Sequence, residues 1–394
     1  MADRIGLQTL HGLLRGASVV SSRRRQAALV TTLLAAACGG PADVAFQPIK
    51  LDPLASAPSP LSTTNELTFL AGGAACVIDS YRHRVSCIDP GGESVEFGAE
   101  GEGPGEFAFP THLLRGASGT IGVLDSRLNR LSMFSPSGEF LASTGGLPRG
   151  FFLHSRQVMD GTVSGSYRKF DSNGDRPMVQ AEIDVATGRV EWERAFPHEA
   201  DLVNCSTPLW RITRLLFGYG DGSGDLLFLA CHGEFLIWYA DRNSEEPAAI
   251  VRSPTYVERY PTEEDVASTR RALRSARWGP PGEEEIRARP KRWYGPSVVD
   301  DRRRYWAVSH WNAGSDVIPP LSHIDMFRLA DDGPEYALTL QVADKVVGMD
   351  VLGDTLAILV VRDVGGVVAE RRVDWYDISG VADPAVGGPT RGSP

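Results

Sequence analysis

The chain alternates short apolar runs with turn-forming residues, and one such unit occurs twice. The sequence DSYRHRVSCIDPGGE at 79–93 returns as DSRLNRLSMFSPSGE at 125–139, which is 46 residues later. In each copy an apolar run ends at Asp, four residues follow, and Arg begins a second apolar run. Two runs separated by a short turn predict an antiparallel hairpin. A repeat of this length with strand patterning is typical of the blades of a β-propeller.

The hairpin register follows from the same alignment. It places Asp79 opposite Arg84, and Asp125 opposite Arg130, on either side of a four-residue turn. We interpret these residues as structural ion pairs that brace the turns and not as catalytic groups. As partly exposed pairs they are expected to contribute about 1 kcal/mol or less each.

Less similar copies of the unit follow along the chain and end at Gly188, Gly333 and Gly380. Counting them gives six four-stranded antiparallel blades, so the predicted fold class is an all-β, six-bladed propeller. Seven blades is the alternative, since the interval from Gly188 to Gly333 has room for one more unit. The last blade shows three strands after Lys345. The segment VAFQPIKL at 44–51 is predicted to supply its fourth strand and so to close the ring.

These motifs also carry a family resemblance. DSYRHRV and DSRLNRL, each followed by Pro-x-Gly-Glu, together with GAEGEGPGEFAFP between them, resemble the bacterial six-bladed β-propeller family related to NHL repeats. The match is specific at 79–110 and 125–139 and only architectural afterwards. The resemblance implies a binding scaffold, although relatives of this architecture include lactonases and other hydrolases. Fold analogy alone does not decide between these functions.

The first segment of the chain has the layout of an export signal. Arg23, Arg24 and Arg25 precede the apolar run AALVTTLLAAA, which leads directly to Cys38. This resembles a bacterial lipoprotein signal, so we expect residues 1–37 to be removed and Cys38 to be lipidated. Ordinary signal cleavage and a buried cysteine are the alternatives. The propeller is then expected over 38–380, followed by a disordered tail at 381–394, in a protein of the bacterial cell envelope.

Charge excludes one class of partner. The formal net charge is −10, and it becomes more negative when the five arginines and one aspartate of residues 1–37 are removed. Nucleic-acid binding needs a basic face that neutralises phosphates. We therefore expect no nucleic-acid partner, and contact with the membrane through the lipid anchor only.

The cysteines outside the signal segment predict disulfides. The hairpin register places Cys76 opposite Cys87, close enough for a bridge. Cys205 and Cys231 form the second candidate pair, because an even count outside the cytoplasm favours bridging. The alternative is that these residues are small buried hydrophobes. No zinc-type spacing occurs, and neither a metal nor a cofactor is predicted.

Two connecting segments stand out from the strand pattern. The glycine-rich loop at 98–107 lacks a Lys-Ser/Thr pair and carries three glutamates, so we interpret it as a tight connector anchored by Phe107 and Phe109. The insertion at 253–296 begins with a capping box formed by Thr262 and Asp265, which predicts a short helix. An insertion of this length is typical of a lid or a disordered segment. Its Trp278 and Trp293 are candidate anchors for a partner.

One polar constellation is a candidate binding pocket. It combines His310, Trp311 and Asn312, together with nearby Asp316, with His112 and Asp350 on predicted innermost strands. The alternative is that these histidines are hydrogen-bonded packing residues. No nucleophile motif and no pair of carboxylates at a catalytic spacing is recognised, so no catalytic residue is predicted.

The sequence therefore predicts an exported, lipid-anchored propeller that binds a protein, peptide or glycan at the cell envelope. A metal-dependent, lactonase-like hydrolase with its site at the channel is the first alternative. A structural module of an envelope assembly is the second.

Overall fold

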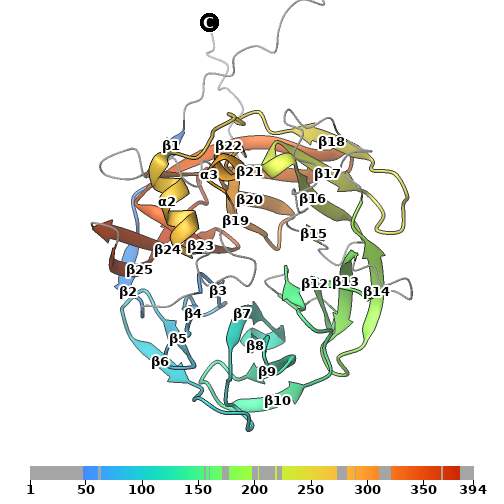
Figure 1. Ribbon diagram of the computed structural model, residues 1–394. Coiled ribbons are helices and arrows are strands. Elements are labelled where there is room, and N and C mark those ends of the chain that lie inside the picture. The colour runs from blue at the N-terminus through green and yellow to red at the C-terminus, as the bar shows by residue number, and fades with distance from the viewer. Residues whose placement is uncertain are drawn as a thin grey trace, which may run out of the picture. The chain divides into compact units, whose positions relative to one another are not determined.

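The computed structural model of the chain describes residues 48–60, 64–154, 157–158, 160–170, 177–197, 203, 218–219, 224–272, 282–288, 290–309, 321–364 and 367–381. All of these belong to one compact unit, Gln47–Pro394. Within them the strands form six sheets that are arranged as the blades of a ring (Figure 1). The predicted six-bladed β-propeller is confirmed, and the seven-blade alternative is wrong.

The blades follow one another in chain order, and their strands are given from the centre outward. Blade 1 contains β3 (Leu67–Phe69), β4 (Ala75–Asp79), β5 (Arg84–Ile88) and β6 (Ser94–Phe97). Blade 2 contains β7 (Pro110–Arg115), β8 (Ile121–Asp125), β9 (Arg130–Phe134) and β10 (Phe140–Thr144). Blade 3 contains β11 (Phe152–Leu153), β12 (Thr162–Arg168), β13 (Met178–Asp184) and β14 (Val190–Ala195).

The second half of the ring is built in the same way. Blade 4 contains β15 (Gly218–Tyr219), β16 (Leu226–Ala230), β17 (Phe235–Tyr239) and β18 (Ala249–Arg252). Blade 5 contains β19 (Tyr294–Val299), β20 (Arg304–Ser309), β21 (Leu321–Ala330) and β22 (Gly333–Ala343), with β1 (Ile49–Lys50) added in parallel at its outer edge. Blade 6 contains β23 (Lys345–Leu352), β24 (Thr355–Val364), β25 (Val367–Asp377) and β2 (Ala55–Pro58).

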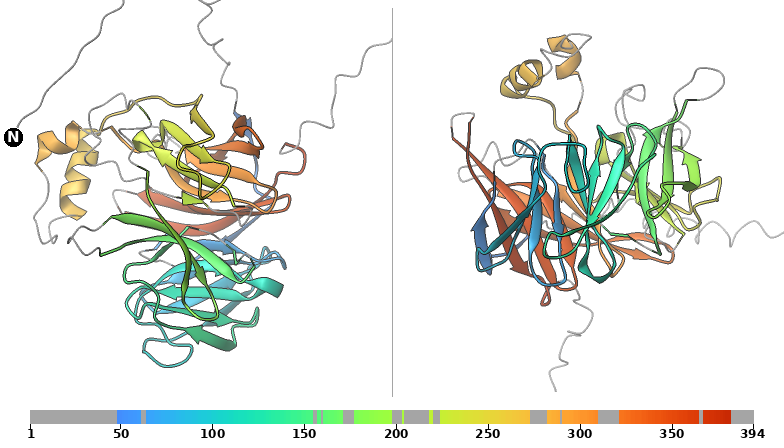
Figure 2. Two further views of the ribbon diagram at one scale, coloured as in Figure 1. Left: turned by 90° about the vertical axis from the view of Figure 1, so that its right-hand side faces the viewer. Right: turned by 90° about the horizontal axis from the view of Figure 1, so that it is seen from below.

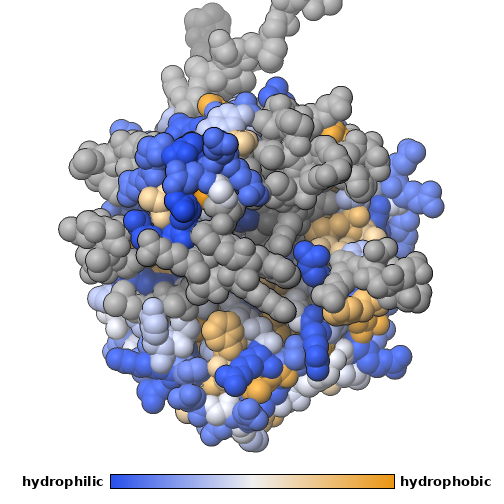
Figure 3. Space-filling view, in the orientation of Figure 1, coloured by the Kyte–Doolittle hydropathy of each residue, from blue (hydrophilic) through white to orange (hydrophobic). Residues whose placement is uncertain are grey.

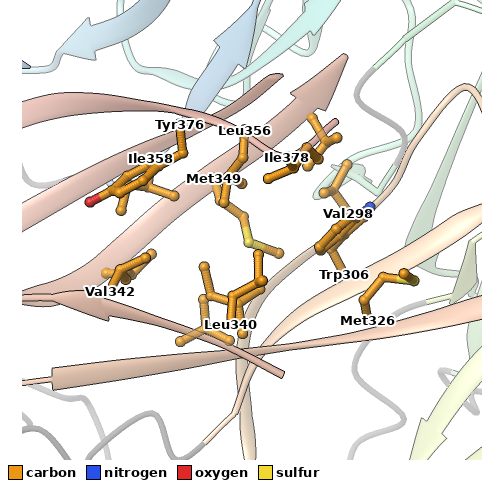
Figure 4. Packing of buried hydrophobic residues seen from close by; sticks show 14 of the residues in the cluster. Val298, Trp306, Met326, Leu340, Val342, Met349, Leu356, Ile358, Tyr376 and Ile378 are labelled. Atoms are coloured by element: carbon orange, nitrogen blue, oxygen red, sulfur yellow. The ribbon is translucent and has the colours of Figure 1, made fainter. Parts of the chain in front are cut away.

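Apolar clusters fill the spaces between neighbouring blades. Between blades 5 and 6, Trp306, Leu340 and Val342 pack against Met349 and Ile358 (Figure 4). Because both faces of a blade are covered in this way, strands β4 and β8 are buried at every position. This explains why their sequences are continuous apolar runs and do not alternate with polar residues.

The predicted hairpin register is confirmed in both copies of the repeat. Asp79 is the partner of Arg84, and Asp125 is the partner of Arg130. Among the described residues, however, neither predicted ion pair forms, and both predictions are wrong. Asp79 pairs with Arg82 at 3.7 Å instead. A short aspartate side chain lies nearer to the groups of its own turn than to the arginine across the hairpin.

The cysteines follow the same register. Cys76 and Cys87 are directly opposed on β4 and β5 and form a disulfide, as predicted. Cys231 is also disulfide-bonded. Its predicted partner, Cys205, lies outside the described residues, so that pairing stays a prediction.

Ring closure uses an N-terminal strand, but not the predicted one. The outer strand of blade 6 is β2, which pairs antiparallel with β25. Of the predicted segment 44–51, the described part forms β1, which pairs with β22 of blade 5. The segment 44–51 was predicted to be the closing strand because it is apolar. The actual closing strand, β2, has the sequence ASAP and buries only Ala57. An outermost strand tolerates such a sequence, including Pro58, because its second edge needs no hydrogen-bond donors.

Consecutive strands of a blade run in opposite directions, so segments that lead into innermost strands share one face with the turns between second and third strands. We call this the entry face. It comprises the described residues 59–60, 64–66, 80–83, 98–112, 126–129, 145–152, 169–170, 177, 196–197, 203, 231–234, 253–272, 282–288, 290–293 and 344. Figure 1 looks onto this face.

The insertion between β18 and β19 stands out from the entry face (Figure 2). The predicted helix is confirmed as α2 (Glu263–Ala272), and a second helix, α3 (Glu283–Arg287), follows. The capping box forms as predicted, with the Thr262 amide on Asp265 Oδ2 at 2.8 Å and the Asp265 amide on Thr262 Oγ1 at 3.3 Å. Arg287 joins the two helices through an ion pair with Glu263 at 2.7 Å.

Candidate functional site

A cavity opens on the entry face where blades 1, 2 and 3 meet. It has a volume of about 360 Å³. Each blade supplies wall residues at or next to its innermost strand, and blade 2 adds Ser126 from the turn between β8 and β9. The described lining residues are Thr64, Asn65, Glu66, Thr111, His112, Ser126, Gly150, Phe151 and Phe152. We call this cavity the three-blade pocket.

A β-bulge at the start of β7 explains why two consecutive residues line the pocket. The pairing of β7 with β8 shifts between Pro110 and His112, which leaves Thr111 as the extra residue. In a regular strand, neighbouring side chains point to opposite faces. The bulge breaks this alternation, as bulges near binding sites commonly do. Thr111 and His112 therefore both reach the pocket.

The His112 ring is held from two sides. Its Nδ1 lies 2.9 Å from Thr111 Oγ1. Its plane meets the Phe152 ring edge-to-face, with 4.1 Å between the ring centroids. His112 is buried, whereas Phe152 is 44% exposed. The pocket therefore presents one aromatic ring to solvent, and a fixed imidazole supports that ring from behind.

The glycine-rich loop at 98–107 forms the neighbouring part of the entry face. Phe107 is buried, as predicted, whereas Phe109 is 47% exposed, so its predicted role as a core anchor is wrong. The backbone bends at Ala108 and Phe109. There, Asp125 Oδ2 accepts hydrogen bonds from the amides of Ala108 at 2.7 Å and Phe109 at 3.0 Å. The loop is thus held by hydrogen bonds to Asp125, and the Phe109 ring remains outside.

Exposed aromatic side chains gather on the entry face. Of the described aromatic residues, six are exposed, and five of these lie on this face: Tyr81, Phe109, Phe152, Phe170 and Tyr260. Figure 3 shows apolar side chains among polar ones over blades 2 and 3, whereas the surface of α2 is polar. None of these five residues was predicted from the sequence to be a contact residue. The available signal was an aromatic residue directly beside glycine, proline or charged turn residues, as in SYRH, FAFP and RKFD.

Asp350 lies elsewhere in the channel. It is fully buried near the far end of β23, where its Oδ2 accepts from the Phe69 amide at 2.7 Å and pairs with Arg115 at 3.2 Å. Arg115 is the last residue of β7, whereas His112 is near its beginning. Asp350 therefore joins the innermost strands of blades 1, 2 and 6 and does not line the three-blade pocket.

The remaining predicted contact residues separate into two groups. Trp293 is 2% exposed and packs against Tyr256, so the structure places it in the core and not on a contact surface. Cys38, Trp278, His310, Trp311, Asn312 and Asp316 lie outside the described residues.

A buried carboxylate ties the insertion to blade 5. Asp325, on β21, accepts hydrogen bonds from Thr255 Oγ1, from Thr339 Oγ1 at 2.6 Å and from the Tyr294 hydroxyl at 3.3 Å. Thr255 lies at the beginning of the insertion, and Tyr294 directly after its end. Burial raises the pKa of Asp325 above its usual range, although these hydroxyl donors act in the opposite direction. The charged form of Asp325 is therefore disfavoured in the folded protein.

This shift predicts a pH-dependent effect of Asp325→Asn. The raised folded-state pKa means that the wild-type contribution is fully present below the unfolded-state pKa of about 4 and is lost as pH rises. Unfolding by urea at pH 4, 5.5 and 7 should show the variant gaining stability relative to wild type as pH increases. Other titrating groups cancel in this difference. A difference that stays constant with pH would contradict the assigned shift.

Two further observations concern the described part of the chain. No three His, Cys, Asp or Glu side chains there are grouped so that they could hold a metal ion. None of its helices has the length and apolar character that crossing a bilayer requires.

Comparison with known proteins shows distant structural likeness. No protein-family model matches the chain, and no curated protein matches it. The chain is similar to a member of the DUF4221 family from Bacteroides vulgatus, with 13% identity over 83% of this chain and 97% of that one and a TM-score of 0.42.

It is also similar to a gluconolactonase from Xanthomonas campestris, with 8% identity over 81% and 87% of the two chains and a TM-score of 0.43. A virginiamycin B lyase from Staphylococcus aureus gives 12% identity over 79% and 94% and a TM-score of 0.38. At these TM-scores none of the three bears on what this chain binds or does.

Proposed function

We propose that this protein is an exported propeller of the bacterial cell envelope that binds a ligand there through its entry face. The observation that carries the proposal is the gathering of exposed aromatic side chains on that face. Aromatic rings supply large contact area at low entropic cost and are enriched where proteins bind partners. The three-blade pocket adds a concave site of the size that small ligands occupy.

Export is supported by two features of the chain. The Arg23–Ala37 segment and Cys38 have the order of a lipoprotein signal, which would tether the propeller to a membrane. The Cys76–Cys87 disulfide and the bonded state of Cys231 suit an oxidising compartment. The resemblance of the repeated hairpins to NHL-related bacterial propellers also supports a binding role.

Paired double variants test the proposal. The full chain would carry Cys38→Ser, so that no acyl group contributes to membrane retention. Against this background, Phe109→Ala/Phe152→Ala removes two entry-face rings, and Phe140→Ala/Leu141→Ala removes comparable exposed area from strand β10. Binding is measured by co-sedimentation with washed envelope fragments.

We expect the entry-face variant to bind at least about tenfold more weakly, because exposed aromatic anchors carry much of a binding energy. The β10 variant should match the parent. Equal binding by both double variants would overturn the proposal.

A further inference from the structure

We propose that the three-blade pocket binds an uncharged sugar unit of an envelope glycan. This inference rests on the proposed function and assigns a ligand chemistry to the same face. It follows from three properties of the pocket: the charge of its lining, the way one aromatic ring is presented, and the polar groups around that ring.

The lining charge disfavours anionic ligands. Among the described residues that line the pocket, none is lysine or arginine, and Glu66 supplies a carboxylate. Phosphates, sulfates and uronic acids would therefore meet the Glu66 carboxylate but no lysine or arginine among these lining residues. Arg127 and Arg149 are next in sequence to lining residues but do not themselves line the pocket. A ligand without net charge fits this lining better than an anion.

The aromatic ring is presented as a platform. Phe151 is buried and lies so close to Gly165 that a Cβ there would approach its ring to 2.4 Å. The adjacent Phe152 is exposed, and His112 supports its ring at 4.1 Å. A sugar ring has one face made mainly of C–H groups. This face packs on an aromatic ring through dispersion and through attraction between the C–H groups and the partial negative charge on the face of the aromatic ring.

Hydroxyl and amide groups surround that platform. Thr111 and Ser126 contribute hydroxyls from blade 2, and Asn65 contributes an exposed amide from blade 1. The Asn65 backbone packs closely against β23, since its carbonyl oxygen would lie 2.3 Å from a Cβ placed on Gly348. The Thr111 hydroxyl is already engaged, since it donates to the Leu124 carbonyl at 3.3 Å and lies 2.9 Å from His112 Nδ1. An apolar ligand would cover the Ser126 hydroxyl and the Asn65 amide without replacing their hydrogen bonds to solvent. A sugar instead offers its hydroxyls as both donors and acceptors.

The size of the pocket also favours a sugar over a protein partner. A volume of about 360 Å³ suits a small ligand or one end of a chain. A specific protein interface of standard size buries about 800 Å² on each partner. Tyr81 and Phe170, the most exposed rings of the entry face, project from separate turns at 68% and 66% exposure. They do not line the pocket.

Calorimetric titration with matched oligosaccharides tests the inference. The full chain with Cys38→Ser is titrated with neutral cello-, malto- and chito-oligosaccharides. Deacetylated chito-oligosaccharides and oligogalacturonates serve as the cationic and anionic counterparts. Phe152→Ala removes the platform, Phe152→Trp restores a larger ring, and Phe140→Ala is the exposed control on β10. Circular dichroism confirms that each variant is folded.

We expect at least one neutral series to bind, with affinity lowered at least about tenfold by Phe152→Ala and retained by Phe152→Trp and Phe140→Ala. Binding of only a charged series, or no binding at about 10 mM, would overturn the sugar assignment. So would neutral binding that Phe152→Ala leaves unchanged.

Failure of the proposed function is distinguishable from failure of this assignment. If Phe109→Ala/Phe152→Ala still abolishes retention on envelope fragments while no oligosaccharide binds, the entry face recognises another ligand, such as a protein. The sugar assignment is then wrong and the proposed function stands. If retention is also unaffected, both are wrong.

Discussion

An Asp125→Ala variant should lose about 3 to 5 kcal/mol of unfolding free energy. Asp125 is fully buried at the end of β8. Its Oδ2 holds the amides of Ala108 and Phe109, and its Oδ1 holds those of Arg127 at 3.0 Å and Leu128 at 2.9 Å. Removing the carboxylate leaves these amides without their acceptor at the point where the entry loop meets the β8–β9 turn. Urea unfolding measures the loss.

The repeat supplies the matched control. Asp79 occupies the corresponding position in blade 1, where it contacts Arg82 through its backbone amide at 3.1 Å and its exposed side chain at 3.7 Å. Asp79 is buried as well, and its charge acts on the buried Arg371. Because Asp79→Ala removes the acceptor of one amide where Asp125→Ala removes that of four, it should cost about 1 to 2 kcal/mol, which is less than the loss in Asp125→Ala. Equal losses of unfolding free energy in the two variants would contradict the account that the four amides bound by Asp125 make it more stabilising than Asp79.

Removal of the closing strand should have an effect of similar size. A chain of residues 61–394 lacks β2, so the ladder to β25 and the burial of Ala57 are lost. The eleven-residue strand β25 then becomes an open edge, which invites pairing between molecules. We expect the unfolding midpoint to fall by about 10 °C or more, together with self-association. Thermal unfolding and light scattering measure the two effects.

A second truncation separates closure from simple shortening. A chain of residues 51–394 lacks β1 but keeps β2, together with Leu51, which packs against the apolar cluster between blades 5 and 6. Because β1 adds only Ile49 and Lys50 to the edge of blade 5, this chain should unfold within about 3 °C of the full protein. If both truncations unfold alike, β2 does not close the ring.

The sequence predicted most of the fold because the repeated hairpins carry their own register. Once Asp79 and Arg84 are aligned, the positions of Cys76 and Cys87 follow, and the structure confirms both pairs. The capping residues Thr262 and Asp265 likewise act within one turn of helix α2. These signals can be recognised in one sequence because each depends only on residues that are close together in the chain.

The closing strand and the loop contacts were not predictable in the same way. Strand β2 is short and weakly apolar, so its pairing depends on the free edge that β25 presents, more than 300 residues later in the chain. The same holds for Phe107 and Phe109, which are alike in sequence context. Only the structure distinguishes them: Phe107 is buried, whereas Phe109 is exposed and its backbone amide donates to Asp125 Oδ2.

The candidate site depends on contacts among three blades, which no local pattern contains. His112 was predicted to lie on an innermost strand, and it does. Its neighbour across the pocket, Phe152, was not singled out, because only the assembled ring brings β7 and β11 together. Asp350 was grouped with His112 by strand type, yet the two residues lie toward opposite ends of the channel.

Photo-crosslinking from single positions would locate the binding surface most directly. Benzoylphenylalanine would replace Phe109 or Phe152 on the entry face, and Phe140 or Val190 on outer strands, in the full chain with Cys38→Ser exposed to envelope fragments. We predict adducts from the first two positions and none above background from the others. Adducts confined to Phe140 and Val190 would show that the outer strands bind the ligand and that the entry face does not.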